Sequence, residues 1–514
     1  MSVNIVIFTD SKPRPFLRYS GAYVIASALR RNGYTVQVVD HFLLLGLDRI
    51  LTIIDKFVGS DTLFVGFSTT FMGIFSDHIQ ESSINEKMFT FSDYIEVRYG
   101  ASTQIGFTHG VPISDIEMDA IRARIKEHNS KTTLVVGGTK ANFLRQNQID
   151  TFILGYADNS VVDYAKFLQG KNPFFQYTPL GDGRIMVDKD VEAIGYNFPK
   201  SSLFYEENDL IEHNEVLPIE ISRGCIFKCK FCSYSMIGKK KNDYTKEKEV
   251  IYAEMMRNYE KFGTTRYSFA DDTFNESVQK LEHFAEVFQR LPFKIEYVAY
   301  LRHDLIWRFP EMADILKESG LKSATFGIET LNHTAGKIIG KGLHPALVRE
   351  TLEWLRDVKG WKNNILMSSG FIAGLPTETR DTVNAWVEEI MDFKYPLDSF
   401  YISSLFIFPD AVRSVKSEFE RNYKEYGYYF DSTKSTGWIN EHWKSEDAEY
   451  LATQMQQYAY GIGRTKSGDF QAMALYNHSH TWDDIYNMSY STNKSDFYKI
   501  MKKTDEYYTR LINL

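Results

Sequence analysis

The sequence predicts an α/β protein in three parts: a doubly wound parallel sheet, a partial barrel of six β/α units, and a mainly helical C-terminal region. Through the first 175 residues, short apolar runs rich in β-branched residues alternate with helical stretches, as expected of parallel strands buried on both faces. Six further apolar runs, again separated by helical stretches, follow between residues 203 and 408. We therefore expect domains at 1–175, 203–408 and 409–514, with a linker at 176–202.

The first domain is predicted from alternating strands and helices. A helix over Ala22–Arg31 ends at Asn32-Gly33, a common stop signal. A long stretch near 70–112 interrupts the alternation, and loops of that length are usually functional or carry structure of their own. The strands are expected at Ile5–Thr9, Thr35–Val39, Thr62–Phe67 and Thr132–Val136.

The second domain is predicted as a partial barrel, in which catalysis belongs at the carboxyl ends of the strands. After residue 409, helical spacing over Ser445–Tyr460, with Ser445 as its cap, predicts a helical region. The six barrel strands are expected at Val216–Ser222, Tyr267–Ala270, Tyr297–Tyr300, Ser323–Ile328, Ile365–Ile372 and Phe400–Phe406.

All three cysteines of the chain, Cys225, Cys229 and Cys232, lie within eight residues. This spacing supplies three thiolates to a four-iron cluster and leaves one iron open to bind a substrate or cofactor. A structural zinc site would need four ligands, and no second cysteine pair exists. A disulfide would leave one cysteine over and strain so short a loop. The residues favour an open iron–sulfur cluster, with zinc or no metal as the alternatives.

Composition excludes several classes of protein. The net charge is −8 and the pI is near 5.9, so no broad basic surface indicates nucleic acid or anionic membrane as a partner. The sequence shows no secretion signal and no uncharged apolar run long enough to span a membrane. We expect a cytoplasmic protein, since reducing conditions protect thiolates and a labile cluster.

The cysteine loop, with Phe231 just before the last cysteine, resembles the signature loop of the radical S-adenosylmethionine (SAM) superfamily. The resemblance implies a 4Fe–4S cluster and SAM, whose cleavage forms a 5′-deoxyadenosyl radical. Three further segments follow in the order found in that superfamily: Phe269–Asn275, Phe326–Thr330 and Gly370–Pro376.

The resemblance also implies contacts with SAM. Asp271 and Asp272 follow the second strand, where the methionine amino group is held, and Glu329 follows the strand whose acidic residue contacts the ribose. Arg302, just past a strand end, is expected either to pair with the cofactor carboxylate or to form an ordinary ion pair. The remaining implied contacts are Phe231, Gly370 and Gly374.

The first domain resembles the Rossmann-like, cobalamin-binding domain that precedes many radical SAM barrels. Small residues at the carboxyl ends of parallel strands leave a crevice for a flat ligand and its nucleotide tail. No Asp-x-His-x-x-Gly follows the first strand, so this loop would supply no lower histidine ligand to cobalamin. A domain kept only as a scaffold or substrate wall is the alternative. The crevice is expected to be lined by Ser68, Gly137 and Gly138.

These resemblances, to cobalamin-dependent methyltransferases and to anaerobic magnesium-protoporphyrin monomethyl ester cyclases, imply a reaction. We expect an enzyme that methylates an unactivated carbon of a small or medium-sized substrate, with flavodoxin or ferredoxin as electron donor. The first alternative is oxidative cyclisation or rearrangement without methyl transfer. A remote alternative is a non-catalytic iron–sulfur adaptor. That alternative predicts a basic face, which this acidic chain lacks.

Overall fold

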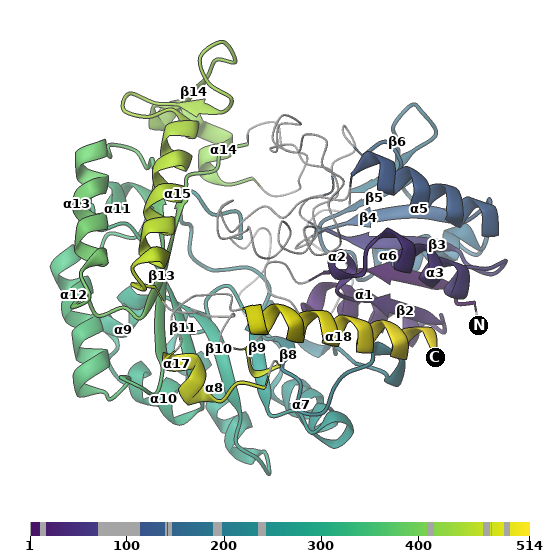
Figure 1. Cartoon of the computed structure of the whole chain (residues 1–514), viewed down its shortest axis with the longest axis horizontal. Helices are drawn as coiled ribbons and strands as arrows, with labels where there is room; N and C mark the ends of the chain where they lie inside the picture. Colours follow the sequence, from purple (N-terminus) through teal and green to yellow (C-terminus); the bar gives the residue numbers. More distant parts are fainter. Residues whose placement is uncertain are drawn as a thin grey trace.

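The computed structural model folds most of the chain into two large sheets and a helical C-terminal region (Figure 1). The insertion predicted near 70–112 and most of the loop after the first strand lie outside the described residues. Alternating strands and helices in both sheets confirm the predicted fold class. The described residues are 2–10, 17–69, 114–138, 141, 146–188, 198–234, 243–408, 416–465, 473, 475–477, 479–487 and 494–514.

The first sheet has its strands in the order β2-β1-β3-β4-β5-β7-β6, all parallel except the β6–β7 pair. The strands are β1 Ile5–Phe8, β2 Val36–Val39, β3 Phe64–Ser68, β4 Thr133–Gly137, β5 Thr151–Leu154, β6 Thr178–Pro179 and β7 Ile185–Asp188. Helices cover both faces, as the doubly wound arrangement requires: α1 Ser20–Arg31 and α6 Ser160–Leu168 on one, and α2 Phe42–Leu45, α3 Leu47–Phe57 and α5 Asp115–His128 on the other.

Three strands of this sheet, β5, β6 and β7, were not predicted. β6 and β7 form a hairpin within the stretch that the sequence assigns to a linker, and β7 pairs with β5. Both strands are short, and β6 includes Pro179, so neither shows the alternating pattern of a typical strand. The domain boundaries themselves stay a prediction.

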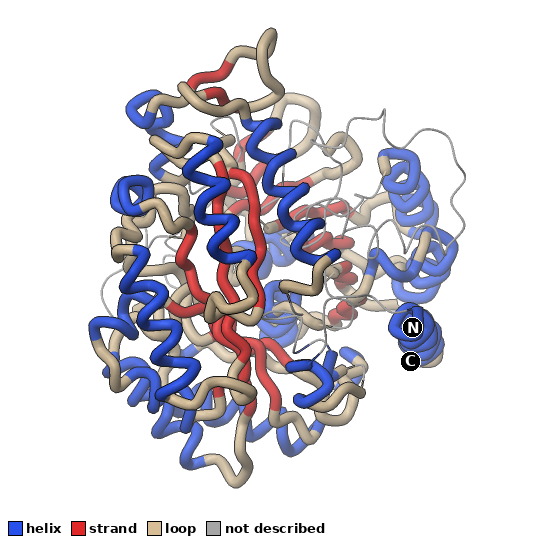
Figure 2. Tube along the Cα trace, turned by 60° about the vertical axis from the view of Figure 1, so that its left-hand side comes forward, coloured by secondary structure: helices blue, strands red, loops and turns tan. Residues whose placement is uncertain are grey.

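The second sheet is a six-stranded partial barrel in the order β13-β12-β11-β10-β9-β8, parallel throughout. Figure 2 shows its strands with helices around their outer side. The strands are β8 Leu217–Glu220, β9 Arg266–Ala270, β10 Glu296–Leu301, β11 Leu321–Glu329, β12 Leu366–Ala373 and β13 Ser399–Ser404. The helices are α7 Lys248–Phe262, α8 Val278–Arg290, α9 His303–Arg308, α10 Met312–Glu318, α11 His333–Ile339, α12 Pro345–Glu353 and α13 Arg380–Met391.

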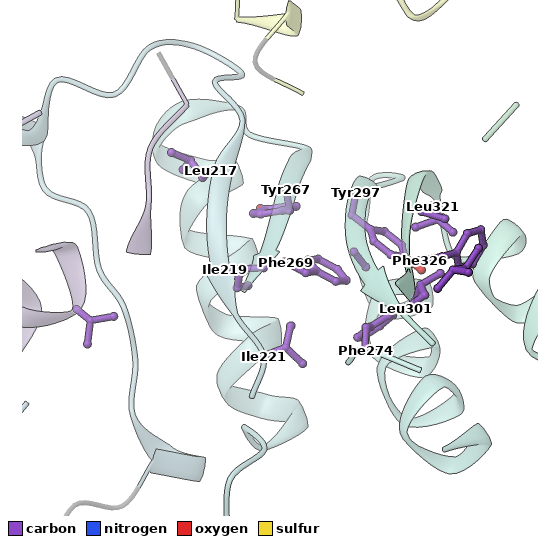
Figure 3. Close-up of a cluster of buried hydrophobic side chains, with 14 of the residues drawn as sticks. Leu217, Ile219, Ile221, Tyr267, Phe269, Phe274, Tyr297, Leu301, Leu321 and Phe326 are labelled. Carbon is purple, nitrogen blue, oxygen red and sulfur yellow. The ribbon is translucent and has the colours of Figure 1, made fainter. Parts of the chain in front are cut away.

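Side chains of the barrel strands alternate between the surrounding helices and the barrel interior. Figure 3 shows part of the outer set, in which Phe269 stacks on Tyr297 with ring centroids 4.3 Å apart. Leu301 and Phe326 belong to the same core cluster. The residues directly before them in sequence therefore face the barrel interior.

The C-terminal region is mainly helical, as predicted, with one antiparallel ribbon. α15 packs on β13 and β12, whereas α18 lies against α2 and α3 of the first domain (Figure 1). Ser445 does not cap α15, because its hydroxyl binds the Glu446 carboxylate at 3.1 Å and Lys444 occupies the cap position. Among the described residues, no helix has the length and apolar character needed to cross a membrane. The elements are α14 Glu418–Asn422, β14 Tyr429–Phe430, β15 Trp438–Ile439, α15 Ser445–Gly461, α17 Trp482–Asn487 and α18 Lys494–Ile512.

Candidate active site at the carboxyl ends of the barrel strands

The three cysteines lie in one loop that follows β8. Gly224 has a φ of +79°, which permits a sharp turn just before Cys225. The loop folds back on itself, because the Cys225 N–H donates to the Tyr234 carbonyl at 2.7 Å. Within it, the Cys232 N–H donates to the Cys229 carbonyl at 3.1 Å. A short hydrogen-bonded loop therefore presents all three thiols that the sequence predicts as cluster ligands.

The thiols differ in their surroundings. Cys225 is buried with its Sγ 3.2 Å from Thr273 Oγ1, and Cys229 Sγ accepts a hydrogen bond from Arg302 Nη1 at 3.5 Å. Burial raises the pKa of the Cys225 thiol and raises the pKa of Cys232 to about 12. Binding of a metal would therefore displace protons from these thiols. Within the described ranges, no three His, Cys, Asp or Glu side chains form a preassembled metal-ligand group, so the loop supplies the thiol donors without a preformed metal geometry.

The two aspartates after β9 have different partners. The Asp271 carboxylate is buried 2.7 Å from Lys280 Nζ. The negative charge of Asp272 instead adds to the effect of burial in raising the pKa values of Cys225 and Cys232. Of the two predicted SAM contacts, Asp272 is the one placed toward the cysteines.

Glu329 ends β11 at a register shift between β11 and β12 and has a φ of +70°. Its carboxylate lies 3.8 Å from Lys341 Nζ, which also donates to the Gly327 carbonyl at 2.8 Å. A Cβ at Gly327 would come within 2.6 Å of that amine, so a side chain there would displace the lysine amine. Burial raises the pKa of Glu329. The predicted ribose ligand is thus held at the carboxyl end of its strand.

Arg302 has a local ion pair and also reaches the cysteine loop. Its guanidinium donates to both carboxylate oxygens of Asp304, at 2.9 and 2.7 Å. It also lies over the ring of Phe227 in the loop, 4.1 Å from the centroid. Phe231, another predicted SAM contact, is half-buried against the main core. Arg302 therefore combines the ordinary ion pair with a position beside the cysteines.

Gly370 and Gly374, two of the predicted SAM contacts, are covered by aromatic rings. A Cβ at Gly370 would lie 2.5 Å from the Tyr401 ring, and one at Gly374 would lie 2.5 Å from the Trp438 ring. Gly374 also has a φ of +88°. Packing against these rings accounts for both glycines within the protein, and their contact with SAM stays a prediction.

Comparison with protein families supports the assignment of the barrel. Residues 219–390 match the model of the radical SAM superfamily. The barrel belongs to this superfamily. Three thiols in one loop of this barrel are a suitable donor set for the superfamily's cluster.

Curated relatives match parts of the chain. An uncharacterized methyltransferase of Pyrococcus horikoshii is 31% identical over 169 residues, which are 32% of this chain and 35% of the relative. Bacteriochlorophyllide d C-12(1)-methyltransferase of Chlorobaculum tepidum is 22% identical over 232 residues, 44% of this chain and 49% of the relative. The chain thus spans less than half the length of these relatives.

A solved structure resembles the whole chain. The radical SAM methyltransferase TsrM from Kitasatospora setae, with cobalamin and a [4Fe-4S] cluster bound, has a TM-score of 0.60 at 14% identity and covers 98% of this chain and 99% of its own. The cobalamin-dependent radical enzyme OxsB has a TM-score of 0.53 at 14% identity, covering 82% and 56%. At these identities the likeness shows the fold.

The radical SAM barrel contains a buried carboxyl group that sequence analysis did not single out. Glu378 is fully buried, and its Oε1 accepts a hydrogen bond from the Thr330 hydroxyl at 2.6 Å. Thr330 directly follows Glu329, so Glu378 is hydrogen-bonded to the residue next to the predicted ribose ligand. Burial raises the pKa of Glu378 to about 7. The signal available in the sequence was an acidic residue in the loop between β12, which ends at Ala373, and α13, which begins at Arg380.

The raised pKa of Glu378 predicts a pH-dependent stability. The unfolded chain releases this proton near pH 4.5 and the folded chain near pH 7, so stability falls as pH rises through that interval and is lowest above it. The loss should be about 3 kcal/mol for the whole interval. Glu378→Gln should remove this dependence and raise the urea midpoint at pH 8. A steeper loss of stability in the variant would contradict the assignment.

Two tyrosines face the interior of the radical SAM barrel. Tyr300 precedes the outward-facing Leu301 and pairs with Thr325, and Tyr401 pairs with Gly370 across β12 and β13. Each tyrosine is 40% exposed, although large aromatic side chains on barrel strands are usually buried. The spread of aromatic residues along the sequence gave no way to identify these two.

The carboxyl edge of the first sheet is lined by small residues. Ser68 pairs with Gly137 at the ends of β3 and β4, and Gly138 follows with a φ of +102°. Gly21 of α1 is close by, since a Cβ there would lie 3.8 Å from Ser68 Oγ. The order β2-β1-β3-β4-β5 places a topological switch point between β1 and β3, where sheets of this kind bind ligands. Ser68, Gly137 and Gly138 thus lie together at this edge, and their contact with cobalamin stays a prediction.

Proposed function

We propose that Cys225, Cys229 and Cys232 hold a 4Fe–4S cluster and that SAM binds beside it at the carboxyl end of the barrel. The observation that carries the proposal is the hydrogen-bonded cysteine loop, which presents all three thiols at the carboxyl end of β8. Bound there, the cluster and SAM supply radical chemistry that side chains alone cannot perform.

The surrounding residues have separate roles in this proposal. The Asp272 carboxylate accepts a hydrogen bond from the amino group of SAM, and Glu329 accepts hydrogen bonds from the ribose hydroxyls. Arg302 donates toward Cys229, and hydrogen bonds to cluster sulfurs influence reduction potential. The exposed rings of Tyr300 and Tyr401 contact a small-molecule substrate on the inner wall. A flavodoxin or ferredoxin supplies the electron.

For the first domain we propose cobalamin binding at the edge formed by Ser68, Gly137 and Gly138, and methylation of an unactivated carbon of the substrate. The small residues at this edge fit a flat ligand, because longer side chains would fill its space. The cobalamin bound in the TsrM structure, which shares this fold, supports the proposal.

The test is anaerobic reconstitution of the full-length chain with iron and sulfide, followed by dithionite and SAM. We expect about four irons per chain, together with 5′-deoxyadenosine and methionine as products. Wild-type protein that takes up iron fully but cleaves no SAM would contradict the proposal.

A second candidate is cyclisation or rearrangement without methyl transfer. It is favoured by a match to the anaerobic magnesium-protoporphyrin IX monomethyl ester cyclase of Cereibacter sphaeroides, 22% identical over 212 residues, 40% of this chain and 33% of the relative. SAM with a deuterated methyl group distinguishes the two candidates. A methyltransferase places the label in a product, whereas a cyclase returns all of it in methionine.

Glu329→Gln should weaken SAM binding by about 1–3 kcal/mol while leaving the cluster intact, because the amide is a poorer acceptor for the ribose hydroxyls. Affinity is measured by titration of the reconstituted protein with SAM. Glu353→Gln is the control, since it removes an exposed carboxylate paired with Arg349 on α12. If both variants bind SAM with equal affinity, Glu329 does not contact the ribose and serves only as a partner for Lys341.

A further inference from the structure

The strand that carries the cysteine loop is joined to the first domain by a buried ion pair at each end. Before β8, Arg18 donates to the Glu215 carboxylate at 2.6 and 3.4 Å. After β8, Arg223 donates to both oxygens of Asp158, at 2.6 and 2.9 Å. All four side chains are buried, and Asp158 lies in the loop that follows β5 of the first sheet.

The pair after β8 is strongly constrained. Arg223 also donates to both carboxylate oxygens of Glu220, at 2.6 and 3.1 Å. The rings of Tyr156 and Phe198 each have their centroid 4.8 Å from the Arg223 guanidinium carbon. A planar guanidinium that is bound by two carboxylates and packed by two rings has a single orientation.

Arg223 is also close in sequence to the proposed cluster site. Only Gly224 separates Arg223 from Cys225 in the sequence, so a shift of the guanidinium moves the first cysteine. On the other side, Asp158 and Tyr156 belong to the loop at the carboxyl end of β5, which neighbours β4 with Gly137 and Gly138. The ion pair therefore connects the two edges to which the proposed function assigns cofactors.

We propose that Arg223 is a positioning residue that fixes the cysteine loop against the carboxyl edge of the first sheet. Through Asp158 it holds the cluster site and that edge at one separation. The identity of the two sites rests on the proposed function, whereas the ion pair does not.

The test compares Asp158→Asn and Arg223→Lys with a matched control in the full-length, iron-loaded chain. Asp158→Asn removes one charge with little change of shape, and Arg223→Lys keeps the charge but lacks the fork. Asp209→Asn is the control, because Asp209 also binds a first-domain arginine, Arg30, through two oxygens at 2.7 and 2.8 Å. Asp209 precedes β8 and is not part of the cysteine loop.

The readouts are iron per chain, SAM cleavage per bound cluster, and the EPR spectrum of the dithionite-reduced cluster. Both test variants should keep the KM for SAM within about twofold, while the cleavage rate per cluster falls roughly 10- to 100-fold because the reacting groups are misplaced. Their EPR g values should shift. Asp209→Asn should match the wild type in all three readouts.

A purely structural pair would lower the amount of iron-loaded protein but leave the rate per cluster unchanged, and that result would overturn the proposal. Equal losses in Asp209→Asn would overturn it too. If Asp158→Asn takes up no iron, Asp158→Glu, which keeps the charge, is measured in the same way. Failure of both to take up iron assigns the pair to folding alone and overturns the positioning role. Wild-type protein that binds iron without cleaving SAM contradicts the proposed function, and the EPR comparison then decides the role of Arg223.

Discussion

Cys229→Ala should abolish both the brown colour of the iron–sulfur cluster and the cleavage of SAM. Losing a group that merely supports a metal ligand already lowers metal affinity or activity about 10- to 100-fold, so losing the ligand itself should cost more than about 100-fold. Cys229 is partly exposed, so its replacement leaves little buried space and should spare the fold. Iron content, visible absorbance and 5′-deoxyadenosine are measured after anaerobic reconstitution.

The control is Ser233→Ala, in the same loop directly after Cys232, which should keep both the colour and the activity. Retention of full iron content and cleavage by Cys229→Ala would show that the cluster is not held by these three cysteines. Stoichiometric zinc, with no iron, in the reconstituted wild type would restore the alternative of a zinc site.

The first four strands of the first sheet and all six barrel strands could be predicted because each is a short apolar run with helical stretches on either side. β11, expected at Ser323–Ile328, spans Leu321–Glu329, and the other predicted strands differ by similar amounts. The signal failed for β5, β6 and β7 at one end of the first sheet. β7 pairs with β5 across a long sequence separation, and such pairing is not encoded in a local apolar pattern. Local patterns thus define the elements of this chain better than the edges of its sheets.

Motif spacing located the candidate site but could not orient its side chains. Nothing in two adjacent aspartates says that Asp271 pairs with Lys280 while Asp272 acts on the cysteines. The ring that covers Gly374 comes from Trp438, 64 positions later in the chain. The raised pKa of Glu378 likewise follows from burial, which is a property of the folded chain. Tertiary contacts decide these features, and no local pattern encodes them.

Gly137→Leu should block the uptake of cobalamin and leave the cluster intact. Gly137 ends β4 opposite Ser68, and a Cβ there would meet the Ile153 carbonyl at 3.5 Å, an ordinary contact. Gly138 is the poorer position to test, because any side chain at its φ of +102° is strained. Overpacking by a leucine side chain typically costs about 1–3 kcal/mol, which corresponds to roughly 5- to 150-fold in affinity.

Binding is measured by incubating the iron-loaded protein with hydroxocobalamin and recording the absorbance that remains after desalting. Gly137→Ala is the graded control and should retain more cobalamin than Gly137→Leu, since a methyl group fills less of the crevice. Because no histidine motif follows β1, the bound cobalt should show the absorbance of an ion without a protein imidazole below it.

Uptake by Gly137→Leu equal to that of the wild type would mean that cobalamin does not lie at this edge. A wild type that forms its cluster fully but takes up no cobalamin would contradict the methyltransferase proposal. The first domain would then serve the radical SAM barrel as a scaffold or substrate wall.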